Sequence, residues 1–172
     1  MNKQNEQDLR FMLDAIENVT IGPLNTEFLA KPISILEPKE PILVKEDTLI
    51  KDIIPLFQTH KCEAVFVTNI DEKLVGIYTE RDLVLKSLKD KDFENNEVSL
   101  YMTKDVLSGK MDHTIAYVLN ILSDGGFKQF PIIDDNGYPI AHITLRNILD
   151  YIVKESIKPL LDVSIPKVNL FS

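Results

Sequence analysis

Two short stretches of this sequence each place a threonine three residues before a side chain with a carbonyl oxygen. The first, GIYTERD, covers residues 76–82, and the second, AHITLRN, covers residues 141–147. A helix that begins at such a threonine leaves backbone N–H groups free for an anion. The carboxylate of Asp82 is a stronger hydrogen-bond acceptor than the amide oxygen of Asn147. The stretches predict a paired binding module in which the first site is the better equipped.

The same spacing also has an ordinary structural explanation. A threonine often caps the N-terminus of a helix, and an acidic residue three positions later favours the positive end of the helix dipole. In isolation, the Thr79 and Asp82 pattern therefore predicts a helix cap more readily than a ligand site. Its repetition in the chain shifts the balance towards ligand binding.

The elements that would position these residues occur twice in the same order: strand, helix, strand, strand, helix. Apolar alternation and turn residues predict the first set at 42–44, from Thr48, at 64–68, at 74–78 and from Thr79 to about Leu88. The second set is predicted at 106–108, 114–125, 130–133, 139–143 and 145–157. A polar stretch at 89–97 separates the two.

The offset in residue number between the two sets is nearly constant. It is 66 from Thr48 to Thr114, and 65 from Thr79 to Thr144. Val65 and Pro131 also differ by 66, so we expect the repeats to differ in length by a single residue at the turn. A fixed period is typical of duplicated units, and each unit alone is too small to bury a good core.

The predicted fold class is therefore α/β (mixed α+β), with two pseudo-symmetric repeats that pack as one module. Each repeat would have a small sheet and two packed helices. The expected division is residues 1–32 for an N-terminal helix and an irregular lead-in, 33–92 and 93–157 for the repeats, and 158–172 for an apolar tail. Residues 8–19 have one apolar helical face, and the tail is apolar enough to pack on the module or on a partner.

Several motifs in this order resemble those of the cystathionine-β-synthase (CBS) domain. Besides GIYTERD, they are YMTKDV at 101–106 and QFPIID at 129–134, which Asn136 and Gly137 follow. The duplication is similar to the tandem CBS pair called a Bateman module. The resemblance covers about Ser34 to Val153, and no effector domain of recognisable type accompanies it, as in a standalone CBS protein.

The resemblance implies clefts between the repeats that accept AMP, ADP, ATP or S-adenosylmethionine as regulatory ligands, with no obligatory cofactor. By position, Asp82 would hold the ribose hydroxyls, Thr79 would contact ribose or phosphate, and Arg81 would reach a phosphate. The matching residues of the second site are Thr144, Arg146 and Asn147, with Ala141 in place of the family glycine. Apolar residues expected at the ligand are Ile42, Val65, Val106 and Pro131.

The chemistry of the two sites differs at one atom. A carboxylate can accept hydrogen bonds from two neighbouring ribose hydroxyls, whereas only one of the two terminal atoms of Asn147 is an acceptor. Loss of charge assistance costs about 1 kcal/mol, or about fivefold in affinity. We therefore expect the Asn147 site to be weaker than the Asp82 site.

The composition argues against several other classes of protein. With a formal charge of −8 and a pI near 4.9, the chain of 172 residues is a poor partner for nucleic acid or an anionic membrane. No apolar run is long enough for a signal peptide or a membrane span, so we expect a cytoplasmic protein without membrane insertion.

The sequence also lacks the patterns of metal and catalytic sites. Cys62 is the only cysteine, which excludes an intramolecular disulfide, and His60, His113 and His142 lie far apart. No nucleophile elbow, Walker-type loop or Rossmann fingerprint is present. We therefore expect neither a metal site nor an enzyme.

These observations leave two hypotheses for function. The first is a regulatory module that binds an adenosine nucleotide between its repeats and responds by a change of packing or of dimer arrangement. The alternative is a ligand-free structural or adaptor dimer that binds a protein partner. In both, the apolar residues of the last helix, such as Leu145, Leu149 and Val153, predict a core or a homodimer interface.

Overall fold

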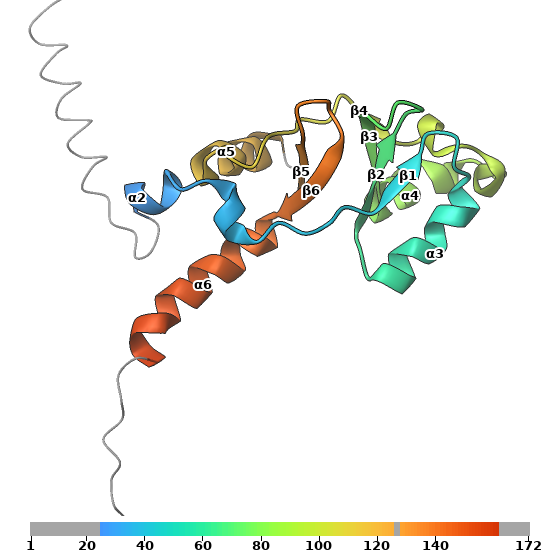
Figure 1. The fold of residues 1–172 in the computed structure, drawn as a ribbon. Coiled ribbons are helices and arrows are strands. Elements are labelled where there is room, and N and C mark those ends of the chain that lie inside the picture. The colour runs from blue at the N-terminus through green and yellow to red at the C-terminus, as the bar shows by residue number, and fades with distance from the viewer. Residues whose placement is uncertain (1–24, 126–127, 162–172) are drawn as a thin grey trace, which may run out of the picture.

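The computed structural model describes residues 25–125 and 128–161 (Figure 1). Four strands form the first sheet, in the order β1 (Leu43–Lys45), β2 (Ala64–Thr68), β3 (Leu74–Thr79) and β4 (Thr103–Lys104). Strands β1 and β2 are parallel, and the other neighbours are antiparallel. Helix α3 (Ile50–His60) connects β1 to β2, and α4 (Glu80–Leu85) follows β3.

The second repeat has a two-stranded antiparallel sheet of β5 (Gln129–Ile133) and β6 (Pro139–Thr144). Helix α5 (Ile115–Gly125) precedes it, and α6 (Leu145–Leu161) follows it. Both repeats thus show the predicted helix, strand, strand, helix order. The mixed α/β fold class is confirmed.

The predicted strand at 106–108 is wrong, because only Gly109 forms a bridge to Ile132 there. In the first sheet, the N–H of Phe66 donates to the Ile42 carbonyl at 2.8 Å. The equivalent residue of β5 is Pro131, which has no N–H to donate. Gly109 keeps the remaining ladder bonds, since its N–H donates to Pro131 and its carbonyl accepts from Ile133.

Other predicted boundaries also shift. The lead-in at 22–41 contains α2 (Thr26–Leu29) and a 3₁₀ turn, η1 (Ile33–Leu36), in its described part. Helix α4 is shorter than predicted, and three 3₁₀ turns follow it: η2 (Ser87–Lys89), η3 (Phe93–Asn95) and η4 (Val98–Leu100). Helix α6 extends beyond the predicted end at 157. The predicted helix at 8–19 and the tail from residue 162 lie outside the described residues.

Each repeat is completed by the segment that precedes the other one. Phe28, Ile33 and Leu36 are buried in the core formed by α5, α6, β5 and β6. Reciprocally, the core of the first repeat includes Val98, Tyr101 and Met102 from the connection that leads to the second. The chain boundaries at 33–92 and 93–157 stay a prediction, and the two cores are built across them.

Backbone hydrogen bonds show that this exchange is symmetric. Val98 N–H donates to the Thr48 carbonyl at 2.9 Å, and Ile33 N–H donates to the His113 carbonyl at 2.8 Å. In residue number, His113 follows Thr48 by 65, and Val98 follows Ile33 by the same step. A second pair of bonds differs by the same step. The Ile50 N–H donates to the Asn96 carbonyl, and the Ile115 N–H donates to the Lys31 carbonyl.

The period is therefore a constant 65. The offsets of 66 taken from Thr48 to Thr114 and from Val65 to Pro131 are wrong, and so is the expected one-residue difference in length. Strand register shows the reason: Ala64 pairs with Thr79, and Gln129 pairs with Thr144. A slip of one residue exchanges the two faces of a strand. Val65 corresponds to Phe130, and both are fully buried in their own cores.

The opposite faces of the sheets form what we call the inter-repeat layer. On the first sheet it consists of Ala64, Phe66 and Ile77, with Leu43, Leu74 and Val106 packed against them. The ring of His142 on β6 lies 5.3 Å from the ring of Phe66. Next to it, Leu74 N–H donates to the Gly137 carbonyl at 3.0 Å. These contacts join the two repeats.

Candidate functional site

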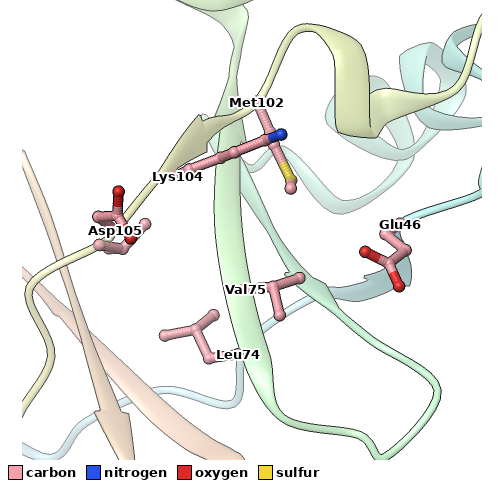
Figure 2. Close-up of a pocket in the computed structure, with 7 residues that line it drawn as sticks. Glu46, Leu74, Val75, Met102, Lys104 and Asp105 are labelled. Atoms are coloured by element: carbon pink, nitrogen blue, oxygen red, sulfur yellow. The ribbon is translucent and has the colours of Figure 1, made fainter.

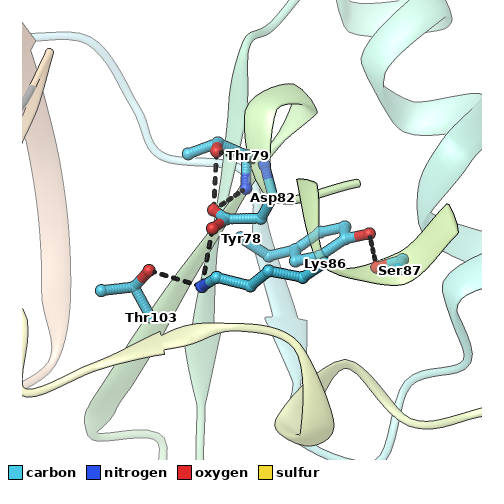
Figure 3. A network of polar contacts seen from close by, with 6 residues as sticks. All are labelled: Tyr78, Thr79, Asp82, Lys86, Ser87 and Thr103. Carbon is cyan, nitrogen blue, oxygen red and sulfur yellow. Dashed lines mark hydrogen bonds and ion pairs between the residues drawn. The ribbon is translucent and has the colours of Figure 1, made fainter. Parts of the chain in front are cut away.

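Thr79 and Asp82 form a complete capping box where β3 passes into α4 (Figure 3). The Asp82 N–H donates to Thr79 Oγ1 at 3.1 Å. In return, Asp82 Oδ2 accepts from the Thr79 N–H at 3.0 Å and from Thr79 Oγ1 at 2.6 Å. The ordinary structural role of the pattern is thus present. It uses one of the two carboxylate oxygens.

The other oxygen of Asp82 faces a lysine one turn further along the helix. Lys86 Nζ lies 2.7 Å from Asp82 Oδ1 and also donates to Thr103 Oγ1 on β4 at 3.0 Å (Figure 3). The Asp82 side chain is only 13% exposed, so this pair is shielded from bulk water more than a surface ion pair. A ligand at Asp82 must share Oδ1 with Lys86.

A buried hydrogen bond lies next to the contacts of Asp82 and Lys86 and joins the segments on either side of α4. Tyr78 Oη and Ser87 Oγ lie 2.7 Å apart, and both residues are fully buried (Figure 3). Burial raises the pKa of the Tyr78 hydroxyl, so it stays protonated as a neutral hydrogen-bonding group. The bond ties β3 to the turn after α4 and so limits the movement of Asp82 and Lys86.

The second cap reproduces the first with an amide. Asn147 Oδ1 accepts from the Thr144 N–H at 2.9 Å and from Thr144 Oγ1 at 2.7 Å, and the Asn147 N–H donates to Thr144 Oγ1 at 3.1 Å. Because the Thr144 N–H needs an acceptor, the cap fixes the orientation of the amide. The atom left over is a donor, Nδ2, whereas the atom left over at Asp82 is an acceptor.

The two arginines predicted at the sites lie in the first turns of α4 and α6. Arg81 and Arg146 are both exposed. Arg146 Nε lies 3.8 Å from Asp150 Oδ2, and both side chains of that pair are largely in solvent. A long exposed side chain beside a helix N-terminus can swing towards an anion without breaking a buried contact.

The apolar candidates divide between the inter-repeat layer and the first core. Val106 packs in the layer, and the buried Pro131 lies on the same face of β5 and β6 as His142. Ile42 is half-buried and packs on the first core. Val65 is completely buried in that core, on the face away from the layer, so Phe66 takes its expected place. The misplacement follows from the one-residue error in the repeat offset.

A hollow of about 390 Å³ lies at the other end of β3 from Thr79 (Figure 2). Leu74, Val75 and Met102 contribute apolar side chains, and charged residues lie at its rim. The full lining is Glu46, Leu74, Val75, Met102, Lys104, Asp105 and Val106. Only Val106 belongs to the predicted ligand residues, so the hollow and the two caps are separate features.

Sequence reasoning missed four polar residues near the predicted sites. Lys86 is four residues after Asp82, a spacing that brings opposite charges together on a helix, and it could have been found. Thr103 comes from a separate strand much further along the chain. Gln129 and His142 lie beside the second cap, and only the strand register shows that they share its face.

The repeated caps, the exchanged lead-in segments and the constant period together match a known family. The family model for the CBS domain matches residues 36–89 and residues 97–154. The chain belongs to the CBS domain family. Its two matches are the two repeats, and the resemblance noted in the sequence is confirmed.

Curated relatives include both small proteins and larger enzymes. An uncharacterized 17.7 kDa protein of Acidianus ambivalens is 29% identical over 120 residues, which are 70% of this chain and 72% of that protein. Inosine-5'-monophosphate dehydrogenase of Methanocaldococcus jannaschii is 34% identical over 111 residues. This match covers 64% of the chain and 21% of the enzyme, so the chain spans about a fifth of the dehydrogenase.

Solved CBS structures have the same fold. A CBS-domain protein of Agrobacterium tumefaciens is 27% identical with a TM-score of 0.63, and the match covers 70% of this chain and 98% of that one. The CBS pair of protein MJ0100, solved with 5-methylthioadenosine and S-adenosyl-L-methionine, has a TM-score of 0.66 at 20% identity. CBSX2, solved with AMP, has a TM-score of 0.63 at 20% identity. The latter two matches each cover 73% of this chain and 98% of the other.

Among the helices that the structure describes, none is both long and apolar enough to cross a membrane. Within residues 25–125 and 128–161, no group of three or more His, Cys, Asp or Glu side chains is arranged to hold a metal ion.

Proposed function

We propose that this protein is a non-enzymatic regulatory module that binds an adenosine nucleotide between its CBS repeats. The ligand would be AMP, ADP, ATP or S-adenosylmethionine, and the response a change in the packing of the repeats. A ligand shifts such an equilibrium only by binding one arrangement more tightly than the other.

One observation carries this proposal: the two caps are equivalent in structure but leave different atoms outside the cap, Oδ1 of Asp82 and Nδ2 of Asn147. Both lie at the end of a strand whose face forms the inter-repeat layer, since Thr79 pairs with Ala64 and Thr144 pairs with Gln129. Oδ1 of Asp82 lies outside the cap, where Lys86 contacts it, and it would accept from ribose hydroxyls in competition with that lysine; Lys86 and Arg81 would supply positive charge for phosphate. The adenosine ligands of the two related solved pairs are of the same class.

The sharpest test exchanges the two side chains. Asp82→Asn retains an oxygen for the capping box but removes the second acceptor and its ion pair with Lys86, so we expect AMP binding at the first site to weaken about five- to tenfold and the melting temperature to fall slightly. Asn147→Asp should strengthen the second site by a similar factor. Calorimetry with AMP, ADP, ATP and S-adenosylmethionine measures both.

Asp82→Ala is the comparison that separates binding from folding. It removes the cap together with the acceptor and should lower the free energy of unfolding by about 1 kcal/mol as well as affinity. Absence of binding of all four ligands to the wild-type protein would remove the proposal. Equal affinities of wild type and Asp82→Asn would show that Asp82 only caps the helix.

A ligand-free adaptor is the second candidate, and the Asp82 network favours it. Both carboxylate oxygens already have protein partners, so the site is satisfied without a ligand. This alternative predicts no rise in melting temperature with any adenosine ligand. It also predicts that Thr79→Ala and Asp82→Ala variants retain partner binding, which parallel pull-downs with wild type and variants from the same lysate would compare.

In either case we propose that the protein forms a homodimer through exposed apolar helix faces. Leu145, Leu149 and Val153 are spaced by four residues on α6 and are about half exposed. Helix α4 and the turn after it also expose Val84, Leu85 and Leu88. An apolar stripe that is exposed among the described residues is typical of an interaction surface and supports this proposal.

A further inference from the structure

Two buried polar atoms beside the second cap have no hydrogen-bond partner. They are Oε1 of Gln129 and Nδ1 of His142, and they are the only such side-chain atoms in the described part of the chain. An unpaired buried polar atom costs stability, and in native proteins most such groups are paired. Within the described residues, Gln129 Oε1 therefore lacks a partner, and the His142 ring, which the Lys39 backbone approaches without a full hydrogen bond to Nδ1, can still take another partner.

Strand register places both on the face that carries the second cap. Gln129 is directly opposite Thr144, and His142 is opposite Pro131, so all four side chains are on one side of the β5 and β6 pair. Thr144 is the residue that holds Asn147 in the cap. The His142 ring packs against Phe66 of the other repeat, which places this face at the inter-repeat layer.

The corresponding positions of the first repeat show that the fold does not need polar groups there. By the constant period, Ala64 corresponds to Gln129, and Ile77 corresponds to His142. Both are buried, at 5% and 7% exposure, with apolar side chains. The glutamine and the histidine are therefore a property of the second site and not of the repeat.

We propose that Gln129 and His142 read the base of a 6-aminopurine nucleotide bound at the Asn147 cap. This inference rests on the proposed function and names the residues that give its second site base specificity. The Gln129 carbonyl would accept from the exocyclic amino group, and the His142 Nδ1–H would donate to the adjacent ring nitrogen. The Nδ2 of Asn147 would donate to a ribose oxygen.

The chemistry of the base supports this assignment. On adenine, one donor, the amino group, stands beside an acceptor on either edge, and a glutamine amide is a usual partner for that pattern. A 6-oxopurine presents an acceptor where adenine presents the amino donor. In the amide orientation of the structure, the 6-oxo group would face Oε1 of Gln129 with no proton between them, and the amide would have to turn over to donate from Nε2, so IMP should bind less well than AMP.

Calorimetry with AMP and IMP on wild type, Gln129→Leu and His142→Phe tests the proposal, with Lys128→Ala as a control at the exposed neighbouring residue. We expect Gln129→Leu to weaken AMP at one of two sites at least tenfold and to abolish the preference over IMP. His142→Phe should have a smaller effect in the same direction. Lys128→Ala should match wild type.

Melting temperature without ligand is the second measurement. Since Ala64 and Ile77 fill the equivalent places, we expect Gln129→Leu to melt at or above the wild-type temperature. A variant that unfolds, or one that binds AMP as wild type does, would overturn the assignment, as would tighter binding of IMP than of AMP. If the wild-type protein binds neither nucleotide, the proposed function itself fails.

Discussion

At the scale of single residues, the two caps show how one atom can separate structural and binding roles. Asp82 and Asn147 both use one oxygen to bind a threonine, with nearly identical distances. The helix start is therefore insensitive to the exchange, whereas the remaining atom changes from acceptor to donor. The aspartate is therefore not needed for the cap. It is needed only for the contacts of its second oxygen, with Lys86 and with the proposed ligand.

The side chain of His142 makes stability depend on pH. Burial lowers the pKa of His142, the Lys39 backbone opposes this shift in part, and the positive charge of Lys39 lowers the pKa further. The unfolded chain binds the proton near the ordinary value of about 6.5, so the unfolded state holds more protons below that pH. The contribution of neutral His142 to the free energy of unfolding is therefore fully present above about pH 6.5. It is lost as the pH falls below that value.

Urea unfolding between pH 7.5 and pH 5.5 measures this effect. We expect the free energy of unfolding to fall with acidification in wild type and to fall less in His142→Phe. His60→Gln is the control, because His60 is exposed. The same pH dependence in wild type and His142→Phe would contradict the assignment to His142.

At the scale of elements, the order of helices and strands could be predicted because apolar periodicity survives in each of them. The absence of the strand expected at 106–108 could not be predicted. It depends on Pro131, a residue distant in the sequence that removes a ladder bond. The register error at Val65 arose because β2 is apolar on both faces, so its sequence does not show which residues face the core.

Close packing of β3 on the connection before β4 explains a glycine in the first repeat. A Cβ at Gly76 would overlap the Met102 side chain and lie 3.1 Å from the Thr103 carbonyl oxygen. The corresponding residue of β6 is Ala141, which is buried but tolerated. The two repeats therefore differ in how closely the connecting segment approaches the strand.

We expect Gly76→Ala to lower the free energy of unfolding by about 1–3 kcal/mol, because the added methyl group overpacks this contact. Urea denaturation measures the change. In a Met102→Ala background the additional cost should be smaller, since part of the overlap is relieved. Equal costs in both backgrounds would place the strain at the backbone instead.

At the scale of the whole molecule, the paired architecture could be predicted from the repeated order of elements, but the exchange of lead-in segments could not. Nothing local in Phe28, Ile33 or Leu36 indicates that they pack on elements of the second repeat. For the proposed site, Thr79 and Asp82 were predicted from their spacing together with its repetition. Gln129 could not be predicted, because its proposed role depends on the partner strand.

The homodimer is a prediction about the whole molecule. If the α6 stripe is the interface, Leu149→Glu should give a monomer at micromolar concentration, because a buried unpaired charge is costly. Ser123→Glu introduces the same charge at an exposed position of α5 and should leave the dimer intact. Sedimentation velocity distinguishes the two states, and a monomeric wild-type protein would end the proposal.

The exchange of lead-in segments also has a consequence for how the protein is made. A ribosome delivers Phe28, Ile33 and Leu36 early, yet the strands and helices that bury them are synthesised last. The first core can close once residue 102 has emerged, whereas these three side chains must wait for α6. During that interval the nascent chain carries an apolar segment without its partner, which is where a chaperone would bind or misassembly would begin.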